Sequence, residues 1–128
     1  VAQLLAAATP QQLRVVVVHQ PAAVPRPADR AAVQAWAAAG ADLVMGGHIH
    51  LPYVAALPGL ARPMWVVQAG TALSSRVRSG VPNSVNLLRW PAEGGSCRVE
   101  QWDFAADQGA FVCVGTTSIQ PARESHVR

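Results

Sequence analysis

The chain is poor in the features that mark several large classes of proteins. It has no lysine and only two cysteines, and charged residues make up 13% of its 128 positions. No apolar run reaches the roughly 18 residues that a membrane-spanning helix needs, and no secretory signal is visible. Cys97 and Cys113 do not make a disulfide framework. We therefore expect no membrane segment, small buried thiols at both cysteines, and a cytoplasmic protein.

The basic charge carries little information about partners. All ten basic residues are arginines, scattered from Arg14 to Arg128, and the formal net charge is +3. No block of five like charges occurs, so a nucleic-acid-binding stripe is not indicated. An Arg-only, Ala-rich composition is also what the coding bias of a GC-rich genome produces. The four tryptophans are not interleaved with basic residues, which favours core packing over base stacking.

What is present indicates a globular chain of one domain or part of one, because 51% of the residues are apolar. The chain begins with Val1, which fits a trimmed methionine and equally a cut in a longer polypeptide that carries its own N-terminus and signal. We expect a folded unit over residues 1–115 and a loose tail over residues 116–128, which has no periodicity.

The first half has the pattern of a crossover unit. Residues 2–8 predict the end of a helix, and the β-branched run at 14–18 predicts a strand that is covered on both faces. Three prolines indicate a loop over 20–28, and a second apolar strand follows at 42–46. Strand, loop, helix and strand in this order predict two parallel, neighbouring strands.

The helix between these strands has recognisable ends. Asp29 is a suitable N-cap, and Gly40 is a suitable C′ residue. The face that packs on the sheet is expected to contain Val33, Trp36 and Ala37.

The second half changes character. Strand-like segments are separated by turn residues. These segments are 63–71, 84–90, 97–105 and 110–115. The alternation over 97–104 is typical of a half-exposed antiparallel strand, and the whole pattern predicts an α/β protein.

Histidines follow the ends of both predicted parallel strands. His19 comes after the first, and His48 and His50 come after the second, just past Gly46 and Gly47. Ligand sites in open α/β sheets gather beyond the carboxyl ends of the strands, and neighbouring strands lie only about 4.8 Å apart. His48 and His50 point the same way if the backbone between them stays extended. Since neutral imidazole is a common ligand of Zn, Mn and Fe, the cluster is a candidate metal site.

By itself the His-x-His pattern leaves other interpretations open. It also describes two surface histidines, or one histidine in the core and one exposed. All three histidines could alternatively bind a single zinc ion. His126, in the polar tail, is expected to be solvated.

Three stretches in this order resemble the C-terminal half of a calcineurin-like metallophosphoesterase, most similar to bacterial relatives of cyclic-nucleotide phosphodiesterases. They are "VVVVHQP", "ADLVMGGHIHLPY" and "VVQAGTALSSRVRSGVPNSVNLL". The resemblance covers residues 14–90 well and the last strands loosely. It implies half of a four-layer α-β-β-α sandwich with mixed sheets.

The resemblance also implies the chemistry. Such enzymes hold two divalent metal ions (Mn, Fe or Zn), joined by a carboxylate and a hydroxide that attacks a phosphomonoester or phosphodiester. His19 and His48 match ligands of the second metal, and His50 matches a ligand of the first. Gln20 stands where many relatives have a further histidine, a change that we interpret as affecting substrate contact.

Several expected motifs of that family are absent. Asp-x-His, Gly-Asp-x-x-Asp and Gly-Asn-His-Asp/Glu do not occur, so the bridging carboxylate and the catalytic residues are expected upstream of Val1. We expect this chain to be the C-terminal portion of a phosphoesterase, inactive without the N-terminal half of the same domain. The alternative is a non-catalytic remnant that serves as an interaction module.

Other polar residues near these motifs have two interpretations each. Arg76 and Arg78 could contact phosphate, but hydrogen bonds to loop carbonyls are the favoured interpretation. Tyr53 could line the mouth of a pocket or simply pack. No substrate-binding residue is assigned from the sequence, which leaves the phosphoester unspecified.

Overall fold

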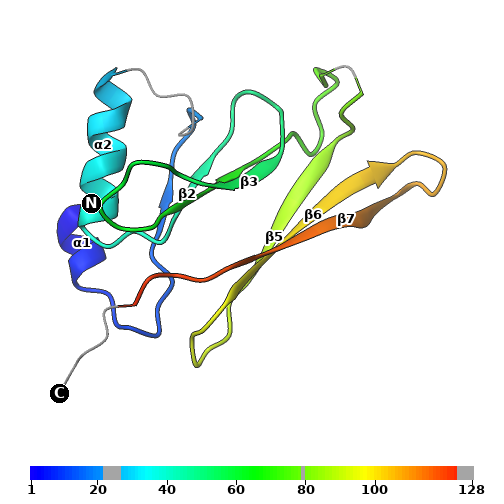
Figure 1. The fold of residues 1–128 in the computed structure, drawn as a ribbon. Helices are drawn as coiled ribbons and strands as arrows, with labels where there is room; N and C mark the ends of the chain where they lie inside the picture. Colours follow the sequence, from blue (N-terminus) through cyan, green and yellow to red (C-terminus); the bar gives the residue numbers. More distant parts are fainter. Residues whose placement is uncertain (22–26, 79, 124–128) are drawn as a thin grey trace.

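The computed structural model describes residues 1–21, 27–78 and 80–123 and contains two sheets (Figure 1). His126, most of the predicted loop at 20–28 and the end of the predicted tail lie outside these ranges. The elements are α1 (Ala2–Ala6), β1 (Val15–Val17), α2 (Pro27–Ala38), β2 (Leu43–Gly46), β3 (Tyr53–Ala56), β4 (Trp65–Gln68), β5 (Ser84–Arg89), β6 (Cys97–Ala105) and β7 (Ala110–Ile119).

The first sheet, sheet A, has the strand order β1-β2-β4-β3. The β1–β2 and β2–β4 pairs are parallel, and β3 is antiparallel to β4. The second sheet, sheet B, has the order β5-β6-β7 and is antiparallel throughout. The predicted crossover between parallel neighbours is therefore confirmed, as is the α/β class, but the expectation of two mixed sheets is wrong for sheet B, which has no parallel pair in the described residues.

The elements form three layers, with α1 and α2 on one face of sheet A and sheet B on the other (Figure 1). Successive residues of the central strands point to opposite faces. Val44 and Val66 thus pack toward the helices, while Leu43 and Val67 pack toward sheet B. All four side chains are fully buried, which explains why these strands are continuous apolar runs.

Helix α2 packs with the face that the sequence predicts but begins earlier. Val33 and Ala37 are buried against sheet A, with Trp36 partly buried beside them. Gly40 has φ +100°, and the N–H groups of Gly40 and Ala41 donate to the carbonyls of Ala37 and Trp36. These bonds form a Schellman motif.

The prediction of Asp29 as the N-cap is wrong, because the helix starts at Pro27 and Asp29 lies in its first turn. Proline is well suited to the first turn because its missing N–H has no helical partner there.

Three further predictions need correction. Strand β3 was not expected, since prolines flank its short apolar run. Strand β7 continues to Ile119, so residues 116–119 belong to the sheet and not to a tail. Cys97 is buried as expected, but Cys113 is exposed because it lies on the outer face of sheet B opposite Trp102.

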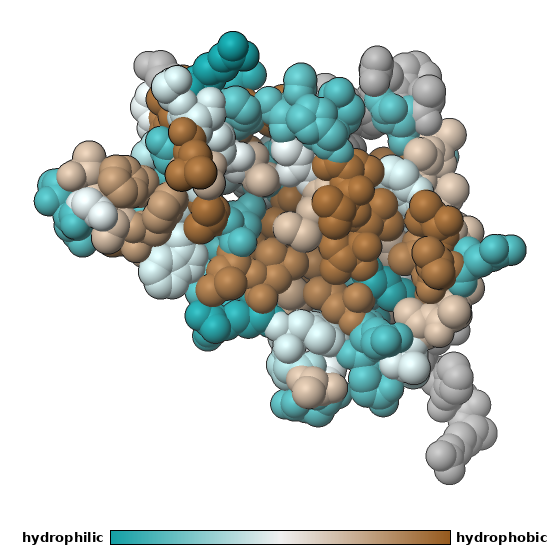
Figure 2. All heavy atoms as spheres, turned by 180° about the vertical axis from the view of Figure 1, so that it is seen from behind, coloured by the Kyte–Doolittle hydropathy of each residue, from teal (hydrophilic) through white to brown (hydrophobic). Residues whose placement is uncertain are grey.

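One side of the molecule leaves both sheets open. Among the described residues, β1 pairs only with β2, and β5 pairs only with β6. Figure 2 shows apolar side chains gathered over this side, across β1 and β5. Val17 is 74% exposed, and Val85 and Leu87 are 38% and 40% exposed. We call the exposed apolar residues of these two edge strands, Val17 of β1 and Val85 and Leu87 of β5, the open apolar face. In the described residues, no helix is both long and apolar enough to cross a membrane.

Candidate metal centre

The histidines follow the carboxyl ends of β1 and β2, which meet at one edge of sheet A. The ladder continues past both strands, because the N–H of Val18 donates to the carbonyl of Met45 (2.9 Å) and the N–H of Gly47 donates to that of His19 (3.1 Å). These backbone bonds align the segment after β1 with the turn after β2. The strand-end placement predicted from the sequence thus brings His19 beside the turn that carries His48.

His19 and His48 are in direct contact. Nε2 of His19 lies 3.0 Å from Nδ1 of His48, and the ring centroids are 4.9 Å apart at an interplanar angle of 72°. One nitrogen donates and the other accepts, because two lone pairs would repel at this distance. Both side chains are exposed, so the pair is open to solvent and to an ion.

His50 is oriented differently. Its Nδ1 lies 2.7 Å from the carbonyl oxygen of Arg76. A carbonyl only accepts, so Nδ1 carries the hydrogen, and in the neutral ring Nε2 carries the free lone pair. Metal-binding histidines commonly have such a backbone partner, which fixes the tautomer.

The turn that carries the histidines has an unusual backbone. His48 and His50 have φ values of +69° and +56°, in the left-handed region that few non-glycine residues adopt. The condition of an extended backbone, under which both rings would point the same way, is therefore not met, and the rings contact different neighbours. A left-handed residue on each side of Ile49 directs the two rings to different neighbours, and this costs backbone strain that the surroundings must hold.

The loop after β4 holds the turn from outside. Nε of Arg78 donates to the carbonyl of Ile49 (2.9 Å), which agrees for Arg78 with the favoured interpretation of a hydrogen bond to a loop carbonyl. The amide of Asn83 donates to the carbonyls of Thr71 and Ser74, both at 3.0 Å, and so fixes the base of this loop.

A buried side chain that the sequence analysis did not single out supports the turn from inside. Gln68, the last residue of β4, is fully buried, and its Nε2 donates to the carbonyl of Gly47. Its own backbone carbonyl accepts from Nδ2 of Asn86 on β5 (2.9 Å). The signal in the sequence was a polar residue closing the apolar run "MWVV".

The nitrogens of His19 and His48 are spaced as two ligands of one metal ion would be, but they do not make a complete site. Two nitrogens at about 2.0–2.1 Å from one zinc ion, with ligand angles of about 90–110°, lie about 3.0–3.4 Å apart. The separation between His19 and His48 falls in this range. Within the described ranges, however, no three His, Cys, Asp or Glu side chains come together as a metal-holding group. The structure thus brings two of the three predicted ligands into contact and does not bring His50 into the same group.

The carboxylate nearest in sequence to the turn is used elsewhere. Asp42 precedes β2, at the opposite end of that strand from His48, and is 1% exposed. Its oxygens accept from Arg62 (2.9 Å), from Arg123 (3.0 and 3.1 Å) and from the backbone N–H of Arg14 (2.9 Å). Asp42 is thus bonded to donors from three residues and lies at the other end of β2 from His48. We therefore assign it to the stability of the fold and not to the histidine site.

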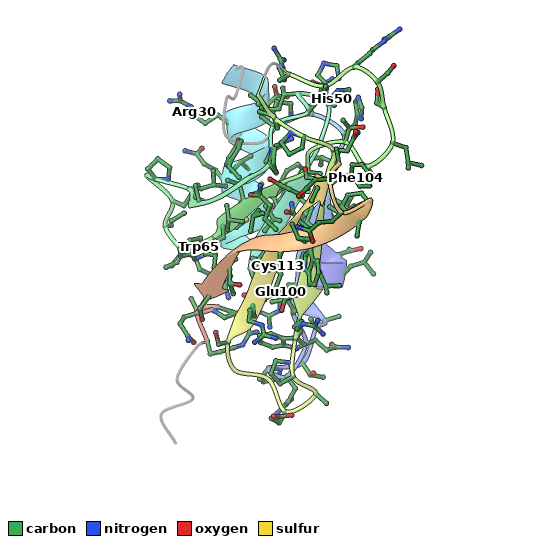
Figure 3. The ribbon with its side chains drawn as sticks, turned by 90° about the vertical axis from the view of Figure 1, so that its right-hand side faces the viewer. Arg30, His50, Trp65, Glu100, Phe104 and Cys113 are labelled. Carbon is green, nitrogen blue, oxygen red and sulfur yellow. The ribbon has the colours of Figure 1, made fainter. Side chains whose placement is uncertain are left out.

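The remaining candidates are structural in character. Tyr53 packs against the helix-side core, and burial raises the pKa of its hydroxyl. Burial likewise raises the pKa of the Cys97 thiol, with Asp42 adding to the effect. Figure 3 shows His50 in the loops at one end of the molecule and Glu100 well below it on sheet B. A hydrogen bond from Arg89 is the main cause that lowers the pKa of Glu100.

No family model matches the chain, and no curated protein matches it. Solved structures do match. A single mutant of Vps29 from Entamoeba histolytica is 15% identical with a TM-score of 0.55, over 81% of this chain and 55% of that chain. Vacuolar Protein Sorting 29 from Cryptosporidium parvum is 18% identical with a TM-score of 0.54, over 81% and 51%.

A third similar structure is wild-type Vps29 from Entamoeba histolytica complexed with Zn²⁺, at 19% identity and a TM-score of 0.50, over 80% of this chain and 52% of that chain. The chain thus spans about half the length of the solved structures that it matches. Identities this low support a statement about the fold alone. This chain shares its fold with part of Vps29, a protein of the calcineurin-like metallophosphoesterase fold.

Proposed function

We propose that this chain is an interaction module built on the metallophosphoesterase fold and that by itself it does not hydrolyse phosphoesters. The observation that carries this proposal is the open apolar face, where β1 and β5 lack a second neighbour among the described residues. Unpaired, apolar strand edges readily join other polypeptide segments. The similar structures support this direction, since one of them is Vacuolar Protein Sorting 29, whose name refers to protein sorting and not to a reaction.

The proposed partner is a polypeptide segment that adds strands to β1 and β5 and covers the open apolar face. The matched Vps29 structures support this choice, because roughly half of their length has no counterpart in this chain. The N-terminal half of the same domain is the segment that best fits this role.

The open apolar face is tested with a charged variant, Val17→Lys/Leu87→Lys. The matched control is Leu73→Lys, since Leu73 is 93% exposed in the loop after β4. We expect the unmodified chain to bind the dye ANS and to self-associate with rising concentration in sedimentation velocity. The double variant should lose most of both signals, and the control should keep them. An unmodified chain that stays monomeric without binding ANS would overturn the proposal.

The absence of catalysis is tested with bis(p-nitrophenyl) phosphate in the presence of Mn²⁺ or Zn²⁺. In the part of the chain that the structure describes, no three His, Cys, Asp or Glu side chains gather as a group that could hold a metal ion, so we expect no turnover. Metal-dependent hydrolysis by the purified chain that disappears in His48→Ala would contradict this expectation.

A second candidate function, the C-terminal portion of a dinuclear phosphoesterase, is favoured by the histidine geometry. The spacing of the His19 and His48 nitrogens suits one ion, and the contact of His50 with Arg76 leaves Nε2 free for another. One similar Vps29 structure is complexed with Zn²⁺, which supports metal binding in this fold. When bound, the two ions would activate a bridging water and stabilise charge on the phosphoryl oxygens.

We expect the unmodified chain to bind Zn²⁺ measurably in isothermal titration calorimetry. The variant His48→Ala should lose this binding. His126→Ala is the matched control, since it removes an imidazole that the sequence analysis assigns to solvent. Equal binding in all three proteins would show that His48 is not a ligand. Loss of binding in His48→Ala alone would support the metal site while leaving the interaction module intact.

A further inference from the structure

We propose that Gln68 is a positioning residue that holds the histidine turn, through the carbonyl of Gly47, in the geometry that brings His48 against His19. This inference rests on the proposed metal site, and it concerns a side chain that is not itself a ligand. Gln68 closes β4 and pairs with Gly46, the last residue of β2. Its side chain therefore lies directly beneath the point where the turn leaves the sheet.

The contacts of Gln68 link three separate segments. Nε2 donates to the carbonyl of Gly47, the residue immediately before His48, and the N–H of Gly47 donates to the carbonyl of His19 (3.1 Å). The backbone of Gln68 is fixed in turn by Asn86 from sheet B. The N–H and the carbonyl of Gly47 are thus both hydrogen-bonded, next to the two rings that contact each other.

The backbone is closely packed where the turn leaves the sheet. A Cβ on Gly46 would lie 2.8 Å from Oε1 of Gln68 and 3.0 Å from the carbonyl oxygen of Gln20. The backbone of Gly46 therefore packs directly against the side-chain amide of Gln68 and against the backbone of Gln20, which follows His19. This close approach is a physical reason for glycine at position 46.

The unsatisfied half of the amide indicates a role beyond stability. Oε1 of Gln68 is buried without a hydrogen-bond partner in the described part of the chain. A buried polar atom of this kind is costly, and its strand neighbours Val66 and Val67 show that apolar side chains suit this sheet. The residue retains an amide at a cost in stability because the turn needs its donor.

The left-handed backbone makes this donor consequential. His48 has φ +69°, a conformation that costs energy and persists only when its surroundings impose it. The Gly47 carbonyl also accepts from the N–H of Ile49 (2.8 Å). Without the Gln68 donor, only this bond within the turn would hold the carbonyl, so the turn could relax toward more common backbone conformations and the His48 ring would leave His19. A variant that tests this role should therefore remove the side-chain N–H donor of Gln68 and keep the volume of the side chain.

The test compares Gln68→Met, which keeps the length of the side chain but has no donor, with Val67→Ala. Val67 is the adjacent residue of β4 and packs toward sheet B. Its replacement by Ala is expected to destabilise the fold without changing a contact of the turn. Zn²⁺ affinity is measured by calorimetry, thermal stability by melting, and the imidazole nitrogens of His19 and His48 by long-range ¹H–¹⁵N spectra of the metal-free chain.

We expect Gln68→Met to weaken Zn²⁺ binding about 10–100-fold, the range seen when groups that orient metal ligands are removed. It should also shift the imidazole signals of His19 and His48 in the metal-free chain. Val67→Ala should lower the melting temperature and leave both properties unchanged. A general loss of stability would affect both variants alike, so this contrast separates positioning from folding.

The outcomes that overturn the inference differ from those that overturn the metal site. If the unmodified chain binds Zn²⁺ and Gln68→Met binds it equally, Gln68 is not a positioning residue. If the unmodified chain binds no Zn²⁺, the metal site fails, and the metal-free spectra then decide the role of Gln68. Unchanged imidazole signals in Gln68→Met overturn the inference in either case.

Discussion

The two sheets are held together in different ways. Sheet A is built from strands of three or four residues whose central members are buried on both faces. Sheet B has strands of six, nine and ten residues with one face open to solvent. Sheet A therefore depends on side-chain packing from two neighbouring layers, and sheet B on a long backbone ladder. The histidine site belongs to the sheet that packing holds rigid.

The acidic residues repeat this contrast. Asp42 lies at the start of β2 with its side chain fully buried, between Arg62 and Arg123. Glu100 faces outward from sheet B, between Arg89 and Arg98, whose side chains are 53% and 55% exposed. The first cluster ties the segment after β7 to sheet A, while in the second two largely exposed arginines bind a carboxylate whose side chain is only 8% exposed. We expect their removal to have very different consequences.

The largest effect is expected for Asp42→Ala. The substitution leaves the guanidinium groups of Arg62 and Arg123 facing each other without an anion, and breaking a buried ion pair by removing one partner costs about 3–5 kcal/mol. Urea unfolding measures this loss. Asp107→Ala, in the turn between β6 and β7, is the control and should change stability by less than about 0.5 kcal/mol. A loss of less than about 1 kcal/mol in Asp42→Ala would contradict the assigned burial of this network.

A smaller effect separates the two sheets by packing alone. Val44→Ala removes two methyl groups from a fully buried site in sheet A, and we expect it to cost about 2–3 kcal/mol. The same change at Val85, which is 38% exposed on sheet B, should cost less than about 1 kcal/mol. Equal losses at both positions in urea unfolding would show that the open apolar face is covered in solution.

The smallest effect is a dependence of stability on pH that Glu100 contributes. The hydrogen bond from Arg89 lowers the pKa of Glu100 in the folded chain, so the unfolded chain takes up the proton first as the pH falls. The contribution is fully present above about pH 4.3, the ordinary value for glutamate, and is lost as the pH drops through the lower folded pKa.

Urea midpoints measured downward from about pH 5 should therefore fall less steeply in Glu100→Gln than in the unmodified chain. Because both arginines are largely exposed, added salt should reduce the difference. If the urea midpoints of the two proteins fall equally with pH, Glu100 does not contribute to the pH dependence of stability.

Much of the fold could be predicted because its signals are local. The apolar runs at 14–18 and 42–46 gave the parallel pair, and the alternation in β6 gave a half-exposed strand. Strand β3 was missed because four residues between prolines carry too weak a periodicity. The extension of β7 over residues 116–119 was missed because Thr and Ser pair well with β6 without showing an apolar pattern.

The candidate site was predictable in its position and not in its geometry. Histidines after two parallel strands had to lie at one edge of the sheet, and His19 does contact His48. The left-handed backbone of His48 and His50 leaves no trace in composition, since it results from the contacts of the turn with Gln68 and Arg78. A metal-holding role for the three histidines stays a prediction.

The order of residues alone determined the α/β class, the crossover and the edge at which the imidazoles lie, because periodicity and strand direction are properties of short segments. Only tertiary structure decided which way each ring points, that Asp42 binds arginines from distant segments, and that the described residues leave one side of both sheets apolar and unpaired. The ring and Asp42 contacts join residues 20 to 81 positions apart, and short-range patterns carry no record of such contacts.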